Sequence, residues 1–374
     1  MIYFWQNPDW PQFTWTTEGL EHNLQAFAEH TGRITGLFDT LNAVESATTL
    51  VDILVQEAMK NAEIEGEYLS REDVASSIRN NLGLNRNKEL IKDRRAAGMV
   101  QAMVAMRESF SQPLTQEMLH HWHRQLMSGY PNMQVGAWRT LSAPMQVVSG
   151  PIGKEEIHFE APPSARVSAE MQQFIQWFNR THPTSGQTPI PYPPIRAAIV
   201  HLYFETIHPY EDGNGRIGRI LAEKALSQGI HRPVLFSISQ SIEADRDAYY
   251  RALKQAQRQA DLSDFIRYFL QVILDAQHRA EAVIHFTIKK VQFFDQYSFQ
   301  INERQRKVLT RMLAEGPRGF LGGMNARKYA ALTRVSKATA TRDLQHLVRI
   351  GALLPIGAGR SRRYRTPLQP DRVN

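Results

Sequence analysis

Polar residues and glycines between His208 and Arg219 have the types and spacing that phosphate chemistry requires, in the run HPYEDGNGRIGR. Gly213, Gly215 and Gly218 permit backbone turns that side chains disfavour, so successive N–H groups can point at one anion. Apolar residues at helical spacing follow, and the positive N-terminal end of such a helix favours negative charge. The segment therefore predicts a phosphate-binding turn that opens a helix.

Three kinds of side chain around this turn could complete the chemistry. Arg216 and Arg219 are three residues apart and share one helix face, where their planar donor groups can grip adjacent phosphates. Asp212 offers the hard oxygen ligand that Mg²⁺ uses when it bridges substrate phosphates. A neutral His208 imidazole could take a proton from an attacking hydroxyl. Each residue alone also fits a structural turn, a helix cap or a surface ion pair, but the combination favours group transfer.

The same twelve residues resemble the Fic family signature, HPFxxGNGRxxR, with Tyr210 in place of the usual phenylalanine. The resemblance implies a nucleotidyltransferase that moves AMP from ATP to a Ser, Thr or Tyr hydroxyl of a target protein and releases pyrophosphate. The aromatic ring at position 210 is retained, and its added hydroxyl needs a partner if it is buried.

The resemblance also implies a role for each signature residue. His208 would be the general base and Asp212 would hold Mg²⁺. The glycine turn would cradle the α-phosphate of ATP, while the two arginines would bind its β- and γ-phosphates. The nucleotide-binding positions would be Asp212, Gly213, Asn214, Gly215, Arg216, Gly218 and Arg219.

Two further parts of a Fic site are expected by resemblance. Two short strand patterns lie between Trp138 and Pro163 and predict a hairpin. In Fic proteins this hairpin is the flap, which pairs with the main chain of the target as an added strand. The flap candidates are Val148, Ser149 and Gly150.

The adenine pocket is expected further along the chain. Tyr249 and Tyr250 match the paired aromatic residues that Fic proteins set against the adenine, and Gln257 falls where the family often has asparagine. Packing of the two tyrosines in a helical core is the competing interpretation.

An inhibitory element is expected at Asn61–Gly66, which reads NAEIEG and resembles the family motif [S/T]xxxE[G/N]. In the family this glutamate, here Glu65, forms a salt bridge with the second signature arginine, here Arg219. A carboxylate bound to that arginine occupies the donors that the γ-phosphate needs. Asn61 departs from the motif, which has Ser or Thr there.

Charge is concentrated at the C-terminal end. Residues 301–374 contain 16 Lys and Arg against 4 Asp and Glu, a balance of +12 in a chain whose total is +7. Helix patterns over 303–315, 325–332 and 337–350, followed by a glycine turn, predict a winged helix-turn-helix. Such a module is expected to bind a polyanion such as DNA, although winged helices also bind proteins. The expected contacts are Lys337, Thr339, Thr341, Arg342, Arg360, Arg362, Arg363 and Arg365.

Composition limits the class of protein. A chain of 374 residues exceeds what one hydrophobic core usually supports. It has no cysteine, which excludes disulfides and thiolate zinc sites and fits a reducing cytoplasm. The start of the chain lacks a basic, apolar leader pattern, and no run of eighteen apolar residues is present, so we expect neither secretion nor membrane insertion.

These patterns predict a mainly α fold: a multi-helix Fic core with a small β-hairpin flap, plus a C-terminal winged-helix domain. The core includes expected helices over 194–207 and 262–274. The expected parts are an N-terminal helical module with the inhibitory motif (1–85), a catalytic domain (86–275), a connecting helix (276–300) and the winged helix (301–374).

Two other functions fit the same residues. One is removal of AMP from a protein, with Glu65 orienting an attacking water. The other is a DNA-binding regulator whose nucleotide pocket senses a ligand. The sequence leaves open the target protein, the nucleotide base and whether the chain forms a homodimer.

Overall fold

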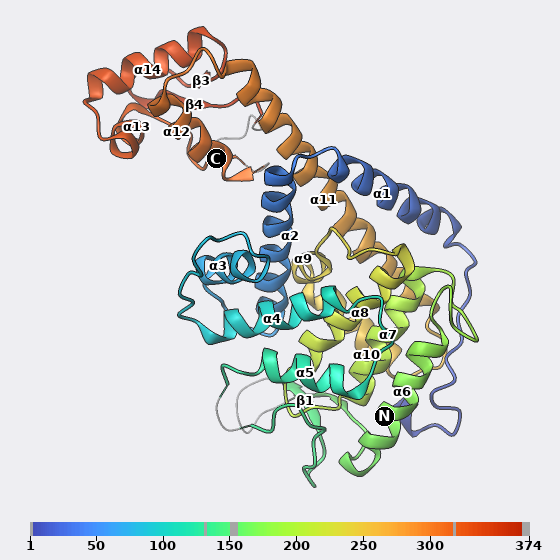
Figure 1. Cartoon of the computed structure of the whole chain (residues 1–374). Coiled ribbons are helices and arrows are strands. Elements are labelled where there is room, and N and C mark those ends of the chain that lie inside the picture. Colours follow the sequence, from blue (N-terminus) through green and yellow to red (C-terminus); the bar gives the residue numbers. More distant parts are fainter. Residues whose placement is uncertain (1–2, 131–132, 150–155, 317–318, 369–374) are drawn as a thin grey trace. The chain divides into compact units, whose positions relative to one another are not determined.

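The computed structural model describes residues 3–130, 133–149, 156–316 and 319–368, and these residues are mainly helical, as predicted (Figure 1). The chain divides into two compact units, Met1–Gly36 with Leu50–Ala280 and Leu37–Thr49 with Glu281–Asn374. Across the described residues no helix is long and apolar enough to cross a membrane. In chain order the helices are α1 (Glu21–Asp39), α2 (Ala43–Ile64), α3 (Arg71–Asn81), α4 (Arg94–Glu108), α5 (Gln116–Leu126), α6 (Ser164–Arg180), α7 (Pro193–Ile207), α8 (Asn214–Ile230), α9 (Ile238–Ala244), α10 (Arg246–Ala256), α11 (Ser263–Tyr297), α12 (Glu303–Leu313), α13 (Ala326–Thr333) and α14 (Lys337–Arg349).

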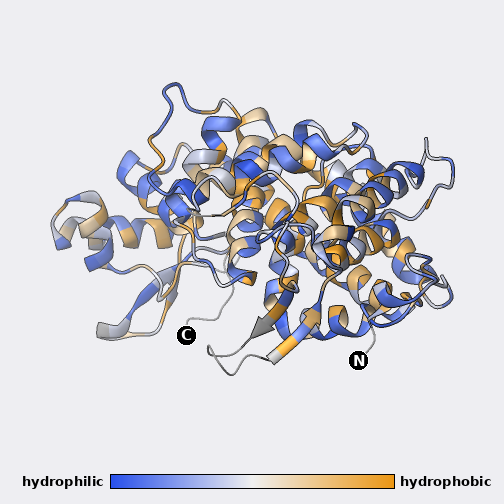
Figure 2. Ribbon diagram, turned by 90° about the horizontal axis from the view of Figure 1, so that it is seen from below, coloured by the Kyte–Doolittle hydropathy of each residue, from blue (hydrophilic) through white to orange (hydrophobic). Residues whose placement is uncertain are grey.

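Helices α7 and α8 pack along each other at the centre of the first unit. Proline occupies the first helical position of α7, where its missing N–H costs nothing. Every residue from Pro194 to Ile207 is buried, which fits a helix that is apolar on nearly all sides. Figure 2 shows the hydrophobic ribbon concentrated in such inner helices. The two helices therefore form a rigid support for the six residues that connect them.

The three signature glycines have different structural roles. Only Gly213 has a positive φ, 80°, and it is the N-cap of α8. Gly215 and Gly218 lie within α8, so the turns expected at these two glycines are wrong. A Cβ atom on Gly218 would clash with Glu205 of α7, so this glycine allows the two helices to approach closely.

The later part of the chain contains one long helix where the sequence patterns favoured two. Helix α11 runs without a break through the expected junction near residue 275. It contains neither glycine nor proline, so nothing in its backbone ends it there. The expected separate connecting helix is therefore a continuation of α11.

The N-terminal segment packs within the first unit through Trp5, which is buried, and Trp10, which is partly buried, while Trp15 is exposed. Trp5 donates its Nε1–H to the Glu160 carbonyl (2.7 Å), and Trp10 donates to Glu170 Oε2 (2.8 Å). Strands β1 (Gln146–Ser149) and β2 (Glu156–Glu160) form the expected antiparallel hairpin, with an irregular register after Val147.

The second unit contains the expected helix-turn-helix and a small hairpin. Helices α12, α13 and α14 begin at the N-caps Asn302, Asn325 and Ser336, each of which accepts a backbone N–H. Strands β3 (Leu354–Ile356) and β4 (Arg363–Arg365) pair in antiparallel fashion. Buried Val308, Leu344, Leu347, Leu353 and Tyr364 are among the residues that share one core.

Candidate active site

His208 lies where α7 ends, at the entrance to the turn before α8. Its backbone is left-handed (φ 52°, ψ 59°), which ends the helix and turns the chain toward α8. Its Nδ1 lies 3.3 Å from the Glu205 carbonyl, which can only accept, so Nδ1 carries the proton and Nε2 keeps its lone pair. Burial lowers the pKa of His208 to about 4. The imidazole is therefore neutral at pH 7 and able to act as a base.

The Glu205 side chain does not change this protonation state. Its Oε2 lies 3.8 Å from His208 Nδ1. Burial, with a smaller contribution from the charge of Glu65, raises the pKa of Glu205 to about 8. Glu205 is therefore largely protonated at pH 7 and does not hold His208 as an imidazolium.

The turn before α8 is closed by Asn214 and Asp212. Asn214 Oδ1 accepts the Tyr210 N–H (2.9 Å), and its Nδ2 donates to the Tyr210 carbonyl (2.9 Å). Asp212 Oδ1 accepts the Gly213 N–H and also a bond from Arg216 Nη2 (3.2 Å). The Asn214 side chain therefore braces the turn, and the backbone N–H groups at the start of α8 are the candidates for anion binding.

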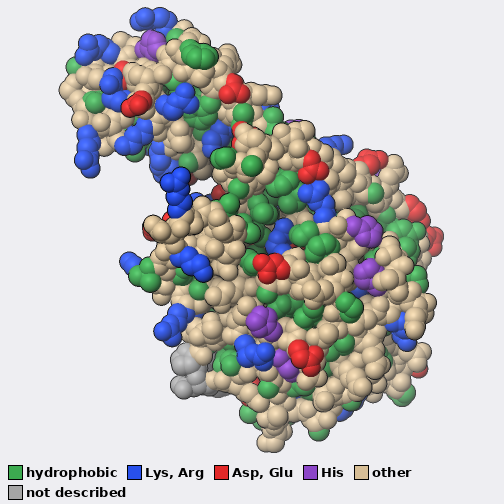
Figure 3. All heavy atoms as spheres, in the orientation of Figure 1, with side chains coloured by type: hydrophobic (Ala, Val, Ile, Leu, Met, Phe, Trp, Pro, Cys, Tyr) green, Lys and Arg blue, Asp and Glu red, His purple; other side chains and the backbone are tan. Residues whose placement is uncertain are grey.

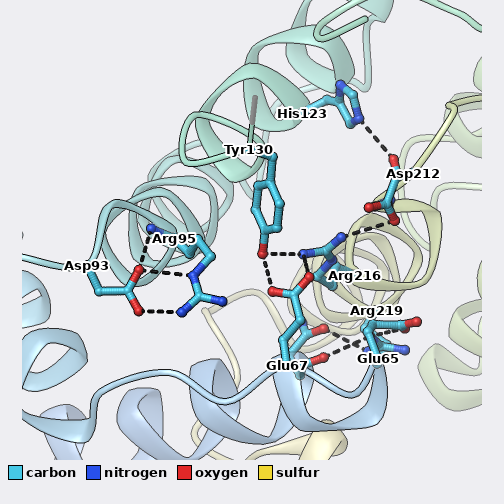
Figure 4. Close-up of polar contacts among 11 residues, drawn as sticks. Glu65, Glu67, Asp93, Arg95, His123, Tyr130, Asp212, Arg216 and Arg219 are labelled. Atoms are coloured by element: carbon cyan, nitrogen blue, oxygen red, sulfur yellow. Dashed lines mark hydrogen bonds and ion pairs between the residues drawn. The ribbon is translucent and has the colours of Figure 1, made fainter. Parts of the chain in front are cut away.

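Glu65 lies against the first turns of α8 and binds Arg219, as the motif resemblance predicts. Its Oε1 accepts from Arg219 Nη2 at 2.7 Å (Figure 4), and a Cβ atom on Gly215 would clash with the same oxygen. Arg219 also donates Nε–H to Asn61 Oδ1 (2.8 Å) and Nη2–H to the Asn61 carbonyl (3.0 Å). The departure from Ser or Thr at position 61 thus supplies a direct ligand for the arginine.

A second carboxylate binds the other signature arginine. Arg216 Nη1 donates to Glu67 Oε1 (3.0 Å) and to the Tyr130 hydroxyl (2.9 Å), and that hydroxyl donates to Glu67 Oε2 (Figure 4). The Arg216 side chain is 2% exposed. Sequence reasoning missed Glu67 and Tyr130, although a second Glu two residues after the motif glutamate was a usable signal.

The expected adenine residues differ in exposure. Tyr249 is buried, and its hydroxyl lies 2.9 Å from His201 Nε2. Its ring therefore belongs to the core, as the competing interpretation held. Tyr250 is 44% exposed and donates to the Ile64 carbonyl (3.1 Å), next to Glu65. Gln257 is buried at the end of α10.

The flap candidates are only partly described. The backbones of Val148 and Ser149 pair with Ile157 and Glu156 in the β1–β2 hairpin. Gly150 lies outside the described residues.

Two buried side chains that sequence reasoning missed, His123 and Arg139, hold the turn in place. His123 Nε2 donates to the Asp212 carbonyl (3.0 Å), and its Nδ1 accepts the Gly136 N–H (2.8 Å). Its ring stacks on Tyr210 at 3.8 Å, and the Tyr210 hydroxyl lies 3.4 Å from His120 Nδ1, a partner of the kind the buried tyrosine needs.

Arg139 binds the backbone on both sides of His208. Its Nε–H donates to the His208 carbonyl (2.8 Å), and its Nη2 donates to the carbonyls of Pro162 and Ile207. Burial lowers the pKa of Arg139 to about 10, which leaves it charged at pH 7. Arg139 thus satisfies carbonyls that the end of α7 leaves free.

Replacement of Arg139 by methionine is expected to reduce the free energy of unfolding by about 3 kcal/mol, because several buried carbonyls lose their donor at once. The matched control is Arg267→Met, since Arg267 makes only an exposed pair with Asp264 and is expected to change stability by less than ~0.5 kcal/mol. Urea unfolding of both variants measures the difference. Equal stabilities would show that Arg139 does not support the turn.

Comparison with known proteins agrees with this architecture. Residues 113–226 match the Fic/DOC family, and residues 3–84 match a domain of unknown function, DUF4172. Residues 319–367 match the C-terminal domain of DIP2311-like transcriptional regulators. The Fic/DOC match thus covers the whole His208–Arg219 segment and the hairpin.

Two solved structures share the fold. A Fic family protein from Desulfovibrio desulfuricans superposes with a TM-score of 0.53 at 21% identity, over 97% of this chain and 99% of that one. A Fic domain containing signaling protein from Bacteroides thetaiotaomicron superposes with a TM-score of 0.54 at 17% identity, over 71% of this chain and 97% of that one.

Curated relatives show the family. A Fido domain-containing protein of Dictyostelium discoideum is 34% identical over 113 residues, which cover 30% of this chain and 72% of that protein. The protein adenylyltransferase Fic of Drosophila virilis is 25% identical over 237 residues, 62% of this chain and 44% of that protein. This chain thus spans less than half of the Drosophila protein. With the signature segment forming the turn between α7 and α8 and the start of α8, the chain belongs to the Fic/DOC family.

Proposed function

We propose that the protein transfers AMP from ATP to a hydroxyl group of a target protein. The observation that carries this proposal is a neutral His208 beside an α-helix N-terminus that also presents two buried arginines. A base next to an anion cradle suits attack by a hydroxyl on a phosphate chain. Relatives named protein adenylyltransferase support the same reaction.

In the proposed reaction, His208 Nε2 takes the proton of the target hydroxyl as its oxygen bonds to the α-phosphorus. The bond from that phosphorus to the bridging oxygen breaks, and pyrophosphate leaves. The N–H groups at the start of α8 would stabilise charge on the α-phosphate. Arg216 and Arg219 would bind the leaving phosphates, so most of the catalysis is positioning and neutralisation of charge.

The residues at the turn fit a Mg²⁺ ion bound together with ATP. Asp212 is half-exposed, and Mg²⁺ commonly takes one or two carboxylates, substrate phosphates and water. Among the described residues no group of three His, Cys, Asp or Glu side chains could hold a metal without the nucleotide. When bound, the ion would neutralise charge on the phosphates.

The proposal includes restraint by Glu65. Its carboxylate binds Arg219 and lies against Gly215, which is the space that the end of the triphosphate needs. The element that carries it is firmly attached: Glu57 of α2 accepts hydrogen bonds from Ser237 and from the N–H and hydroxyl of Ser239.

The flap would present the target by pairing with its main chain.

Incubation of the Glu65→Gly variant with Mg²⁺ and α-labelled ATP tests the proposal, with self-modification or a lysate as acceptor. Label on protein that disappears in Glu65→Gly/His208→Ala supports AMP transfer through His208. No label in either variant would contradict transfer. Loss of AMP from a previously modified protein would instead indicate the reverse reaction.

A second role in DNA binding is favoured by the charge of the C-terminal module. Lys337 and Arg342 are exposed near the start of α14, and Arg362 is exposed in the hairpin that follows. Figure 3 shows Lys and Arg side chains gathered over this unit. Asp343 does not oppose them, because it is buried against Tyr329 (2.8 Å).

Replacement of Arg362 and Arg363 by alanine is expected to weaken DNA binding and to reduce its salt dependence by about two units of slope, since each phosphate contact contributes roughly 0.9. Fluorescence anisotropy of the full chain with duplex DNA at several salt concentrations measures both. The charge-matched control is Lys289→Ala/Lys290→Ala on α11. Equal effects of the two double variants would exclude a specific role of the hairpin.

A further inference from the structure

The two signature arginines are bound by two carboxylates that lie only two residues apart. Glu65 binds Arg219 at 2.7 Å, and Glu67 binds Arg216 at 3.0 Å. Both arginine side chains are almost fully buried, at 1% and 2% exposed. We propose that Glu67 and Tyr130 form a second inhibitory contact, which withholds Arg216 from the phosphate chain as Glu65 withholds Arg219. This inference rests on the proposed function.

The turn after α2 explains how one short segment reaches both arginines. The N–H groups of Glu65 and Glu67 both donate to the Ala62 carbonyl, each at 3.0 Å. Gly66 between them has φ 78°, with open space around the position of a Cβ, so backbone conformation favours glycine here. The turn therefore places two carboxylates side by side, opposite arginines three residues apart on α8.

Tyr130, Glu67 and Arg216 form a three-way hydrogen-bond network. The Tyr130 hydroxyl accepts from Arg216 Nη1 and donates to Glu67, so each of the three side chains contacts the other two (Figure 4). Burial, and then the hydrogen bond to Glu67, raises the pKa of Tyr130, so the hydroxyl keeps its proton. Both N–H groups of Arg216 Nη1 are therefore occupied, and a phosphate oxygen that binds Nη1 must displace Glu67 or Tyr130.

Arg216 itself also binds Asp212, the expected metal ligand. Arg216 Nη2 donates to Asp212 Oδ1 (3.2 Å) while Nη1 is bound by Glu67 and Tyr130. The Arg216 guanidinium is thus paired with Glu67 through Nη1 (3.0 Å) and with Asp212 through Nη2 (3.2 Å). Its charge is thus already neutralised by protein carboxylates, and ATP must compete with both of them.

Nucleotide binding by isothermal titration calorimetry tests the inference without turnover. We expect Glu67→Gln to tighten binding of Mg²⁺–ATP about tenfold, the effect of weakening one charged hydrogen-bond partner. Tyr130→Phe should tighten it by a smaller factor, since Glu67 remains. AMP, whose single phosphate needs only the glycine turn, should bind all variants equally. The control is Glu63→Gln. Glu63 lies in the same region, but its carboxylate pairs with Lys60.

The decisive comparison is made in the Glu65→Gly background. If Glu67 guards Arg216 separately, adding Glu67→Gln tightens ATP binding by a further factor of about ten. If Glu67 only supports the position of Glu65, the second change has no effect and the inference is overturned. Thermal unfolding confirms that each variant is folded. Tighter ATP binding without any label transfer would leave this inference standing and remove the proposed function.

Discussion

The Glu65→Gly variant is expected to transfer AMP about 10- to 100-fold faster than the wild type at limiting ATP, because one charged hydrogen-bond partner of Arg219 is removed. In the proposed mechanism the salt bridge at 2.7 Å, on an arginine 1% exposed, competes directly with the phosphate chain. The measurement is the initial rate of label transfer from α-labelled ATP over a range of ATP concentrations.

The control for this effect is Glu63→Gln. Glu63 lies two residues earlier and pairs with Lys60, so its loss changes local charge without freeing either arginine. Its rate should equal that of the wild type. A Glu65→Gly rate no higher than that of the wild type would show that the contact with Arg219 does not restrain the enzyme.

The second large effect is expected at His208. In the Glu65→Gly background, His208→Ala should lower the rate of AMP transfer by about 10²- to 10⁴-fold, the usual contribution of a general base. ATP affinity should change little, because in the proposal the turn and the arginines, not His208, hold the phosphates. Single-turnover label transfer and calorimetric ATP binding separate the two quantities.

His231→Ala is a matched control for His208→Ala. His231 ends α8 with φ 58°, as His208 ends α7 with φ 52°, so both changes place alanine in the same unfavourable backbone conformation. The His231 variant should keep its transfer rate. Similar losses in both variants would assign the effect to backbone strain and would contradict a role for His208 as base.

The signature turn and the inhibitory glutamate could be expected from the sequence because each is carried by a short, continuous run of residues. The helix patterns likewise placed α12, α13 and α14 within two residues of their observed ends. Local spacing also predicted the β1–β2 hairpin. In each case the pattern that makes the prediction lies within one short, continuous stretch of sequence.

The supporting residues could not be found this way, because their partners are distant in the chain. Glu67 lies 149 residues before Arg216, and Arg139 lies 69 residues before His208. The tyrosine pair shows a second limit. Adjacent helical residues point in directions about 100° apart, and the sequence does not say that Tyr249 faces the core while Tyr250 faces outward.

Gly218 shows why a motif position does not define its own role. Its φ is helical, and its missing side chain serves the contact between α7 and α8. A glycine that allows close helix packing and a glycine that allows a turn look alike in a sequence. Only the position of Glu205 on the facing helix distinguishes them.

The central claim is that the Glu65→Gly protein moves the AMP part of ATP to protein. Parallel reactions with ATP labelled at the α- or the γ-phosphate, with Mg²⁺ and the same acceptor, test it most directly. The account predicts that α-label becomes covalently attached to protein while γ-label leaves as pyrophosphate. Attachment of γ-label instead, or attachment of neither label with acceptor present, would contradict it.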